Sequence, residues 1–147
     1  MSLHKVPVDI WCEDDDLMPI RGTDGSSGWD LRASEDVTIG ARGIVMVRTG
    51  VRIQMPWGWE AQVRSRSGMS LNGMTVANSP GTIDNDYTGE ICVILHNHLD
   101  IDYVVSRGDK IAQMTFQEVP AIDFIRRHGD GPTETERGAG GFGSTGT

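Results

Sequence analysis

Short segments rich in β-branched residues recur along this chain of 147 residues, and Gly, Pro or Asp bounds most of them. In one segment Val51, Ile53 and Met55 alternate with polar residues, which is the period of a half-buried strand. About eight to ten such strands at near-regular spacing predict an all-β sandwich, barrel or jelly roll. The clearest segments lie at 37–39, 43–47, 50–55, 60–64, 90–95, 102–105 and 110–116.

One short helix is expected at 67–72, because Gly73 follows it and favours a helix end. Towards the C-terminus the composition turns to Gly, Thr and Glu. We therefore expect a folded domain at 1–128 and a flexible arm at 129–147.

The arm carries side chains that suit an anionic ligand with a ring. A guanidinium binds phosphate, a flat aromatic face stacks on a base, and glycines leave backbone N–H groups accessible. These features favour a flap that closes over a nucleotide, and the alternative is a disordered Gly-rich tail. The residues concerned are Arg137, Phe142, Gly143, Ser144 and Thr145.

The net charge of −8 argues against a broad nucleic-acid-binding surface, although a local arginine cluster with a divalent metal could bind one small polyanion. No apolar run approaches the roughly 18 residues of a membrane span. The N-terminus leads into no apolar signal segment, and Cys12 and Cys92 form no CxxC pair. We expect a cytoplasmic protein without a nucleic-acid or membrane partner.

Two stretches carry candidate chemistry. Arg66 and Ser67 stand where a strand is expected to give way to the short helix, so they suit an anion, although Ser67 could simply cap the helix. Asp84 lies in an acidic turn and could act as a general base or beside a metal, although such a segment is more often a plain hairpin turn. Asn78 can both donate to and accept from a pyrimidine edge, whereas Tyr87 alone fits a core or turn aromatic.

Two other patterns in the sequence give weaker evidence of a functional site. His96 and His98 would face one side of a strand as a possible zinc pair, but no further ligand of suitable spacing follows. Trp57 and Trp59 flank Gly58, and in an acidic chain core or interface packing is the better interpretation of them.

Taken in order, five motifs of this chain resemble those of the homotrimeric dUTPase family. The resemblance runs from about residue 24 to the C-terminus, and the motifs keep the family's order along the chain. They are 27–33 (SGWDLRA), 66–70 (RSGMS), 78–90 (NSPGTIDNDYTGE), 107–113 (RGDKIAQ) and the Gly-rich tail.

The resemblance implies a jelly-roll subunit, a homotrimer with shared active sites, and hydrolysis of dUTP to dUMP and pyrophosphate with Mg²⁺. Asp84 corresponds to the general base for the water that attacks the α-phosphorus. Asn78, with the neighbouring backbone of 81–83 (Gly81, Thr82 and Ile83), corresponds to the group that reads the uracil edge. Tyr87 resembles the tyrosine that packs under deoxyribose.

By the same resemblance, Ser67, Gly68 and Gln113 fall at phosphate-contacting positions beside Arg66, and Asp30 at the aspartate associated with magnesium through water. In the arm, the resemblance implies a γ-phosphate clamp and a ring that stacks over uracil. The clamp residues are Arg137, Ser144 and Thr145, the stacking ring is that of Phe142, and Gly143 between them counts among the substrate-binding positions.

The chain departs from the family pattern at Ser65, Lys110 and Ala139. None of these removes a presumed catalytic group. Two alternatives remain open at this point: a dCTP deaminase-like enzyme of the same fold, and a non-catalytic trimeric protein that binds a regulatory partner.

Overall fold

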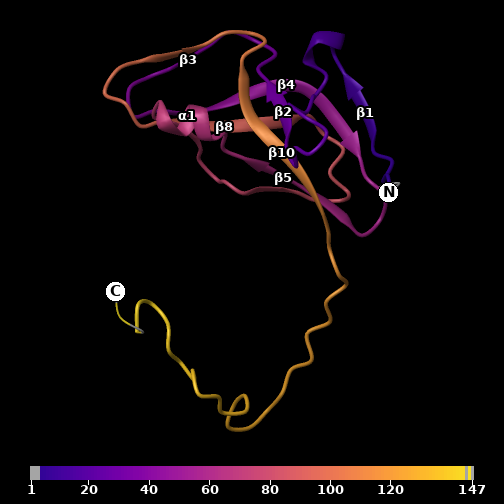
Figure 1. Ribbon diagram of the computed structural model, residues 1–147, viewed down its shortest axis with the longest axis vertical. Coiled ribbons are helices and arrows are strands. Elements are labelled where there is room, and N and C mark those ends of the chain that lie inside the picture. The colour runs from indigo at the N-terminus through magenta and orange to yellow at the C-terminus, as the bar shows by residue number, and fades with distance from the viewer. Residues whose placement is uncertain (1–3, 145, 147) are drawn as a thin grey trace.

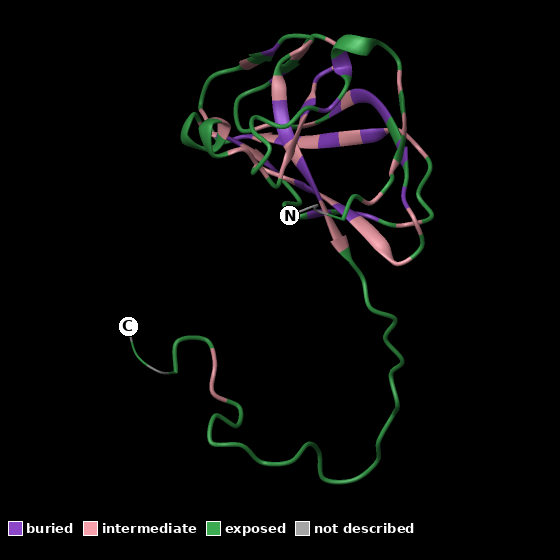
Figure 2. Ribbon diagram, turned by 45° about the vertical axis from the view of Figure 1, so that its right-hand side comes forward, coloured by how far each residue is buried: buried purple, intermediate pink, exposed green. Residues whose placement is uncertain are grey.

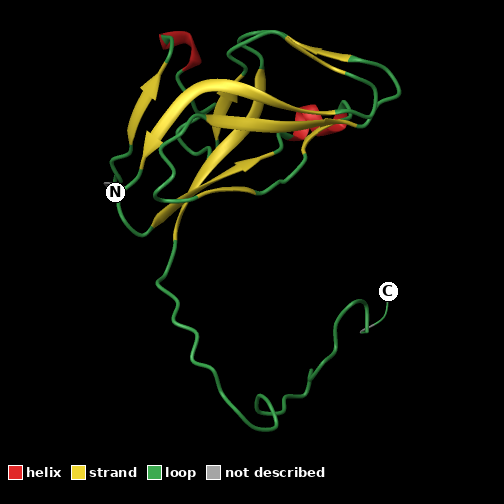
Figure 3. Cartoon of the chain, turned by 180° about the vertical axis from the view of Figure 1, so that it is seen from behind, coloured by secondary structure: helices red, strands yellow, loops and turns green. Residues whose placement is uncertain are grey.

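The computed structural model describes residues 4–144 and 146. Their regular elements are ten strands, one α-helix and one 3₁₀ helix, so the protein is all-β with one short helix as predicted (Figures 1 and 3). In chain order they are β1 (Asp9–Cys12), η1 (Asp15–Leu17), β2 (Trp29–Arg32), β3 (Val37–Ile39), β4 (Ile44–Gln54), β5 (Trp59–Arg64), α1 (Ser67–Leu71), β6 (Met74–Val76), β7 (Gly81–Ile83), β8 (Ile91–Asn97), β9 (Tyr103–Val105) and β10 (Lys110–Glu118).

The strands form two antiparallel sheets of four and one pair. One sheet has the order β1-β4-β8-β6, the other has the order β2-β10-β5-β7, and β3 pairs with β9. Neighbouring strands in each sheet come from distant parts of the sequence, which is the crossing pattern of a jelly roll. In the second sheet, β10, the last strand of the described chain, lies between β2 and the β5 strand that leads into α1.

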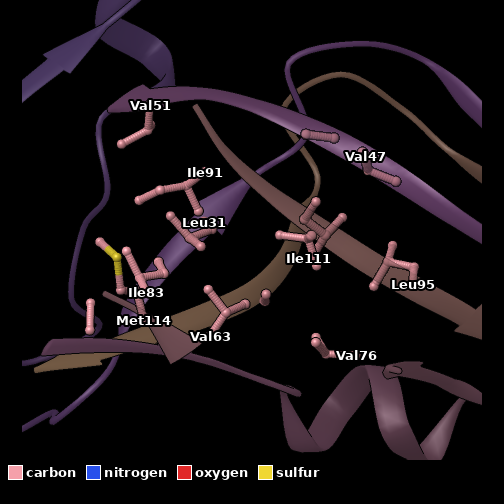
Figure 4. Close-up of a cluster of buried hydrophobic side chains, with 14 of the residues drawn as sticks. Leu31, Val47, Val51, Val63, Val76, Ile83, Ile91, Leu95, Ile111 and Met114 are labelled. Atoms are coloured by element: carbon pink, nitrogen blue, oxygen red, sulfur yellow. The ribbon is translucent and has the colours of Figure 1, made fainter. Parts of the chain in front are cut away.

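The core lies between the two sheets. In β8 every second residue is buried, which is the alternation expected of a strand with one face on the core (Figure 2). Figure 4 shows Val47 and Leu95 of the first sheet pointing toward Ile111 and Val63 of the second. Each such aliphatic side chain contributes about 1.5–3 kcal/mol through burial, so the two sheets are firmly apposed.

The strands expected at 43–47 and 50–55 are one continuous strand, β4. The pairing of β4 with β8 shifts register between Arg48 and Val51, and Gly50 adopts a φ of +70° there. This is a β-bulge, which bends a strand without ending it. Reading Gly50 as a strand boundary was therefore wrong.

The expected short helix is confirmed. It spans Ser67–Leu71, and Gly73 follows with a φ of +82°, a conformation that favours glycine. Asp84 was expected in an acidic turn, and the structure confirms a turn there, but the three residues before it form a strand that was not predicted, β7, which pairs with β5.

Beyond Glu118 the described chain contains no helix or strand, and it runs away from the sandwich as a long exposed arm (Figures 1 and 2). None of the helices in the described part of the chain is long and apolar enough to span a membrane.

Candidate active site

The first cluster surrounds Arg66, which precedes α1 in extended conformation. Its Nε lies 3.0 Å from Oδ1 of Asp30 on β2, and its Nη1 donates to the backbone carbonyl of Lys110 on β10. The Lys110 ammonium lies 3.3 Å from Oδ2 of the same aspartate. One carboxylate, with only 16% of its side chain exposed, thus holds two cations from different elements in fixed positions.

Gln113 joins this cluster from β10. Its Nε2 donates to the backbone carbonyl of Ser65 at 3.0 Å, next to Arg66, and in the sheet it pairs with Asp30. A Cβ on Gly28 would lie 2.3 Å from Oε1 of Gln113, so only glycine allows this approach. The resemblance implied phosphate-contacting positions for Gln113 with Arg66 alongside, and a magnesium-associated position for Asp30, and the fold brings the three residues together.

Ser67 and Gly68 are exposed in the first turn of α1. Arg66, rather than Ser67, is the residue that precedes the helix, and no side chain caps it. A Cβ on Gly68 would meet no atom within 4 Å, so the surface above this turn is open. The interpretation of Ser67 as a simple helix cap was therefore wrong.

The second cluster is the turn from 84 to 90 between β7 and β8, with the residues that lead into β7. Asn78 packs closely against Gly81, where an added Cβ would lie 2.9 Å from the Asn78 Nδ2. The Tyr87 N–H donates to the Asp84 carbonyl at 3.1 Å, which closes the turn. Asp84 itself is exposed, and its carboxylate forms no ion pair with any residue that the structure describes.

A hollow of about 400 Å³ opens beside this turn. The turn contributes Asp84, Tyr87 and Glu90 to its lining, after Thr82 and Ile83 of β7. The opposite lining comes from β4 and β8, and consists of Met46, Ile91, Cys92 and Ile94. An acid group and an aromatic ring therefore share one largely apolar concavity, which suits a ring-bearing ligand.

Hydrogen bonds join the C-terminal end of the turn to β4. Glu90 accepts hydrogen bonds from the Arg48 Nε at 2.9 Å and from the Gly50 N–H at 2.7 Å. Arg52 donates to the Thr88 carbonyl at 2.9 Å. Burial and the nearby Glu90 raise the pKa of the Cys92 thiol. The sequence interpretation missed these hydrogen bonds, because they join residues about 40 positions apart and leave no local pattern.

The arm residues lie apart from both clusters. Arg137 donates to the Gly140 carbonyl at 2.8 Å, and Phe142 is fully exposed with a φ of +53°. Gly143 and Ser144 follow, and Thr145 lies outside the described residues. The arm leads away from the two sheets that carry both clusters (Figure 1).

The structure also places the histidine pair and the tryptophan pair that the sequence analysis singled out. The His96 and His98 rings lie 4.0 Å apart, and Thr75 hydrogen-bonds His98, but the described residues hold no group of three or more potential ligands placed for a metal. Trp59 packs against the core, whereas Trp57 is 90% exposed, so of the expected core or interface packing only interface packing stays a prediction for Trp57.

Comparisons with known proteins agree with this geometry. The profile of the dUTPase family matches residues 15–146. Deoxyuridine 5′-triphosphate nucleotidohydrolase of Helicobacter pylori (strain P12) is 50% identical over 131 residues, which cover 88% of this chain and 89% of that protein.

Two solved structures share the fold. A dUTPase of Staphylococcus bacteriophage 80alpha with dUPNHPP has a TM-score of 0.85 at 21% identity, covering 96% of this chain and 99% of that one. A mutant dUTPase of phage phi11 of S. aureus, whose structure concerns the coordination of a structural Mg(II) ion, has a TM-score of 0.76 at 19% identity, covering 84% and 97%. By its sequence and its fold, this chain belongs to the dUTPase family.

Proposed function

We propose that this protein hydrolyses dUTP to dUMP and pyrophosphate, with Asp84 as the general base. The observation that carries the proposal is the pairing of an exposed carboxylate with the Tyr87 ring in one hollow. Membership of the dUTPase family and the similarity to the Helicobacter nucleotidohydrolase support the choice of substrate.

In the proposed reaction the Asp84 carboxylate accepts a proton from a water molecule. The water oxygen forms a bond to the α-phosphorus, and the bond from that phosphorus to the bridging oxygen of the β-phosphate breaks. Pyrophosphate leaves with the electron pair of the broken bond. A carboxylate is a weak base at neutral pH, so the rate depends on holding the water in line with the phosphorus and on offsetting the charge of the triphosphate.

We assign the triphosphate to the cluster around Arg66, with contributions from Ser67, Gly68 and Gln113. Arg66 is suited to this role because Asp30 and the Lys110 carbonyl fix its orientation before any ligand binds. A preoriented guanidinium gives up less side-chain entropy on binding than a free one. The exposed turn of α1 leaves its hydroxyl and backbone N–H groups accessible.

We assign the base and sugar to the second cluster. Asn78 and the backbone of 81–83 supply donors and acceptors for a uracil edge, and cytosine would present a donor where uracil presents an acceptor. The Tyr87 ring is proposed to lie under deoxyribose and leave no room for a 2′-hydroxyl. Its hydroxyl donates a hydrogen bond to the Glu90 carbonyl, which supports this assignment because the ring is held in place.

We propose Mg²⁺ as the cofactor, carried by the substrate. Mg²⁺ keeps several waters and binds through one or two carboxylates plus substrate phosphates, so a protein cage of several acids is not required. Asp30 fits a water-mediated contact, because Arg66 and Lys110 already bind its oxygens directly. When bound, Mg²⁺ offsets the negative charge of the triphosphate.

We further propose a homotrimer in which the arm of one subunit closes over the site of another. The course of the arm supports this proposal, because the arm that carries Arg137, Phe142, Gly143 and Ser144 runs away from the two sheets of its own chain (Figure 1). Thr145 is assigned to the same clamp by resemblance alone. The division into a domain at 1–128 and an arm at 129–147, the cytoplasmic location and the lack of nucleic-acid and membrane partners stay predictions.

The experiment that tests the function offers dUTP, dCTP and dTTP separately with Mg²⁺ and separates the products by chromatography. We expect rapid dUMP from dUTP alone. Deamination of dCTP would assign the chain to a deaminase, and no turnover of any nucleotide would favour a non-catalytic partner protein.

A further inference from the structure

The side chain of Asn85, next to Asp84, binds a different part of the fold from the rest of its turn. Its Nδ2 donates to the Pro56 carbonyl at 2.7 Å and to the Trp59 carbonyl at 2.9 Å. Both hydrogens of the amide are therefore used. The Pro56 carbonyl lies in the connection between β4 and β5, and the Trp59 carbonyl belongs to the first residue of β5, where that connection ends. Asn85 is half-buried there, whereas its neighbours on either side are exposed.

The β4–β5 connection is a firm anchor. It joins a strand of the first sheet to a strand of the second, so both ends of it are fixed by the sandwich. Gly58 in this connection adopts a φ of +85°, and its carbonyl accepts a hydrogen bond of 2.8 Å from the Val119 N–H, just after β10. Three elements thus hold the carbonyl groups to which Asn85 donates.

Asp84, by contrast, lies just beyond the last paired residue of its strand. The pairing of β7 with β5 ends at Ile83, which lies opposite Ala61. Asp84 is the next residue, and the contact of Asn85 is the first side-chain attachment after the sheet ends. A second hollow of about 370 Å³ lies on this side of the turn, lined by Trp57, Glu60, Asp84 to Asp86 and Val119 to Ala121, so there is space into which an unattached turn could move.

We propose that Asn85 is a positioning residue for the reaction: by holding the β4–β5 connection it sets the place of the Asp84 carboxylate relative to the bound α-phosphate. The inference rests on the proposed role of Asp84. Asn85 touches neither substrate nor water in this account and acts through the backbone of its neighbour. A displacement of about 1 Å at a reacting group can cost up to about 100-fold in rate, so a modest relaxation of the turn is enough to matter.

Two variants test it in the full-length protein. Asn85→Asp keeps the shape of the side chain but places a carboxylate against two carbonyl oxygens, and Asn85→Ala removes the attachment without adding a charge. We expect kcat for dUTP, per folded protein, to fall by about 10- to 100-fold in Asn85→Asp and by a smaller factor in Asn85→Ala. KM and the Kd of the non-hydrolysable α,β-imido-dUTP are expected to stay within about threefold of wild type, because the base and phosphate clusters are untouched.

Asn97 offers a matched control. Its amide donates to the carbonyl groups of Ile39, Gly40 and Ile101 at 2.8–3.2 Å, and it is fully buried. It ends β8, six residues along from Ile91, so it lies about 20 Å from the start of that strand, where the Asp84 turn joins it. Asn97→Asp is expected to lower the thermal midpoint while leaving kcat per folded protein within about twofold of wild type.

Unchanged kcat in both Asn85 variants, with a lowered thermal midpoint, would overturn the proposal and leave Asn85 as a structural residue. So would a tenfold weaker binding of α,β-imido-dUTP, because that would mean the attachment shapes the whole pocket rather than the base alone. A wild-type protein without dUTP turnover is a distinct result, since it would refute the proposed function itself.

Discussion

The hydroxyl of Tyr87 donates a hydrogen bond of 2.8 Å to the backbone carbonyl of Glu90, three residues along the same turn. Glu90 is itself bound by Arg48 and by the Gly50 N–H of β4. A Cβ on Gly89 would lie 2.7 Å from the Tyr87 hydroxyl, so glycine is needed between them. The ring is thus fixed to the turn and, through Glu90, to the first sheet.

A fixed ring at this place predicts discrimination against ribonucleotides. Tyr87→Ala is expected to lower the ratio of kcat/KM for dUTP over UTP by about 10-fold or more, because the surface that excludes a 2′-hydroxyl is gone. Tyr87→Phe keeps the ring and should keep most of the discrimination, at a stability cost of about 1 kcal/mol for the lost hydrogen bond. Steady-state kinetics with both nucleotides measures this, and wild-type discrimination in Tyr87→Ala would contradict the assignment.

Asp84→Asn keeps the size of the side chain and removes the base. We expect turnover of dUTP to fall by about 10²- to 10⁴-fold, while the Kd of α,β-imido-dUTP stays within about threefold. The control is Asp86→Asn, a change of an exposed residue of the same turn to another good turn former, which should leave turnover within about threefold. Wild-type turnover in Asp84→Asn would remove this residue from its role.

Asp30 is expected to matter for both stability and activity. Asp30→Ala leaves Arg66 and Lys110 without their shared carboxylate, so we expect a loss of about 1–3 kcal/mol in the free energy of unfolding and about a 10-fold lower kcat/KM. Asp24→Ala is the comparison, because Asp24 is fully exposed and lies 3.9 Å from Arg21, a pair worth little. Denaturant unfolding and steady-state kinetics of both variants measure these losses. Equal free energies of unfolding and equal kcat/KM in the two variants would contradict the expected role of Asp30.

The exchange of arms between subunits can be tested by complementation. A chain truncated after Thr135 keeps every strand and Asp84 but lacks Arg137 and Phe142, so we expect it to fold and to be nearly inactive. The Asp84→Asn chain has the arm but lacks the base. Unfolding the two together and refolding them should restore activity, because a mixed trimer can place an intact arm over an intact base.

Two results would count against that arrangement. Full activity of the truncated chain alone would show that no flap is needed. Failure of the mixture to regain activity, with mixed trimers demonstrated by mass spectrometry, would show that each arm serves its own chain.

Much of the fold follows from local pattern. The strand at 37–39 has the predicted bounds, and the helix begins at Ser67 as expected. The break predicted near Gly50 was wrong because a glycine in a strand marks either an end or a bulge, and only the pairing with β8 distinguishes them. The three residues of β7 were hidden for a similar reason, since a strand that short has too few alternations to show a period.

In the site, too, local pattern predicts some features and long-range contacts determine the rest. Motif order identified Arg66, Asp84 and Tyr87 as candidates, but not what holds them. Arg66 and Asp30 are 36 residues apart, and the Asn85 amide reaches carbonyl groups 26 and 29 residues away. Such contacts depend on which strands become neighbours in space, and a single sequence does not contain that information in readable form.

Hydrolysis of dUTP in water enriched in ¹⁸O shows which phosphorus atom the water attacks. Attack on the α-phosphorus, as proposed for the water that Asp84 activates, predicts that the label appears in dUMP and that pyrophosphate remains unlabelled. Mass spectrometry of the two products reads this out. Label in pyrophosphate would place the attack on the β-phosphorus and contradict the proposed reaction.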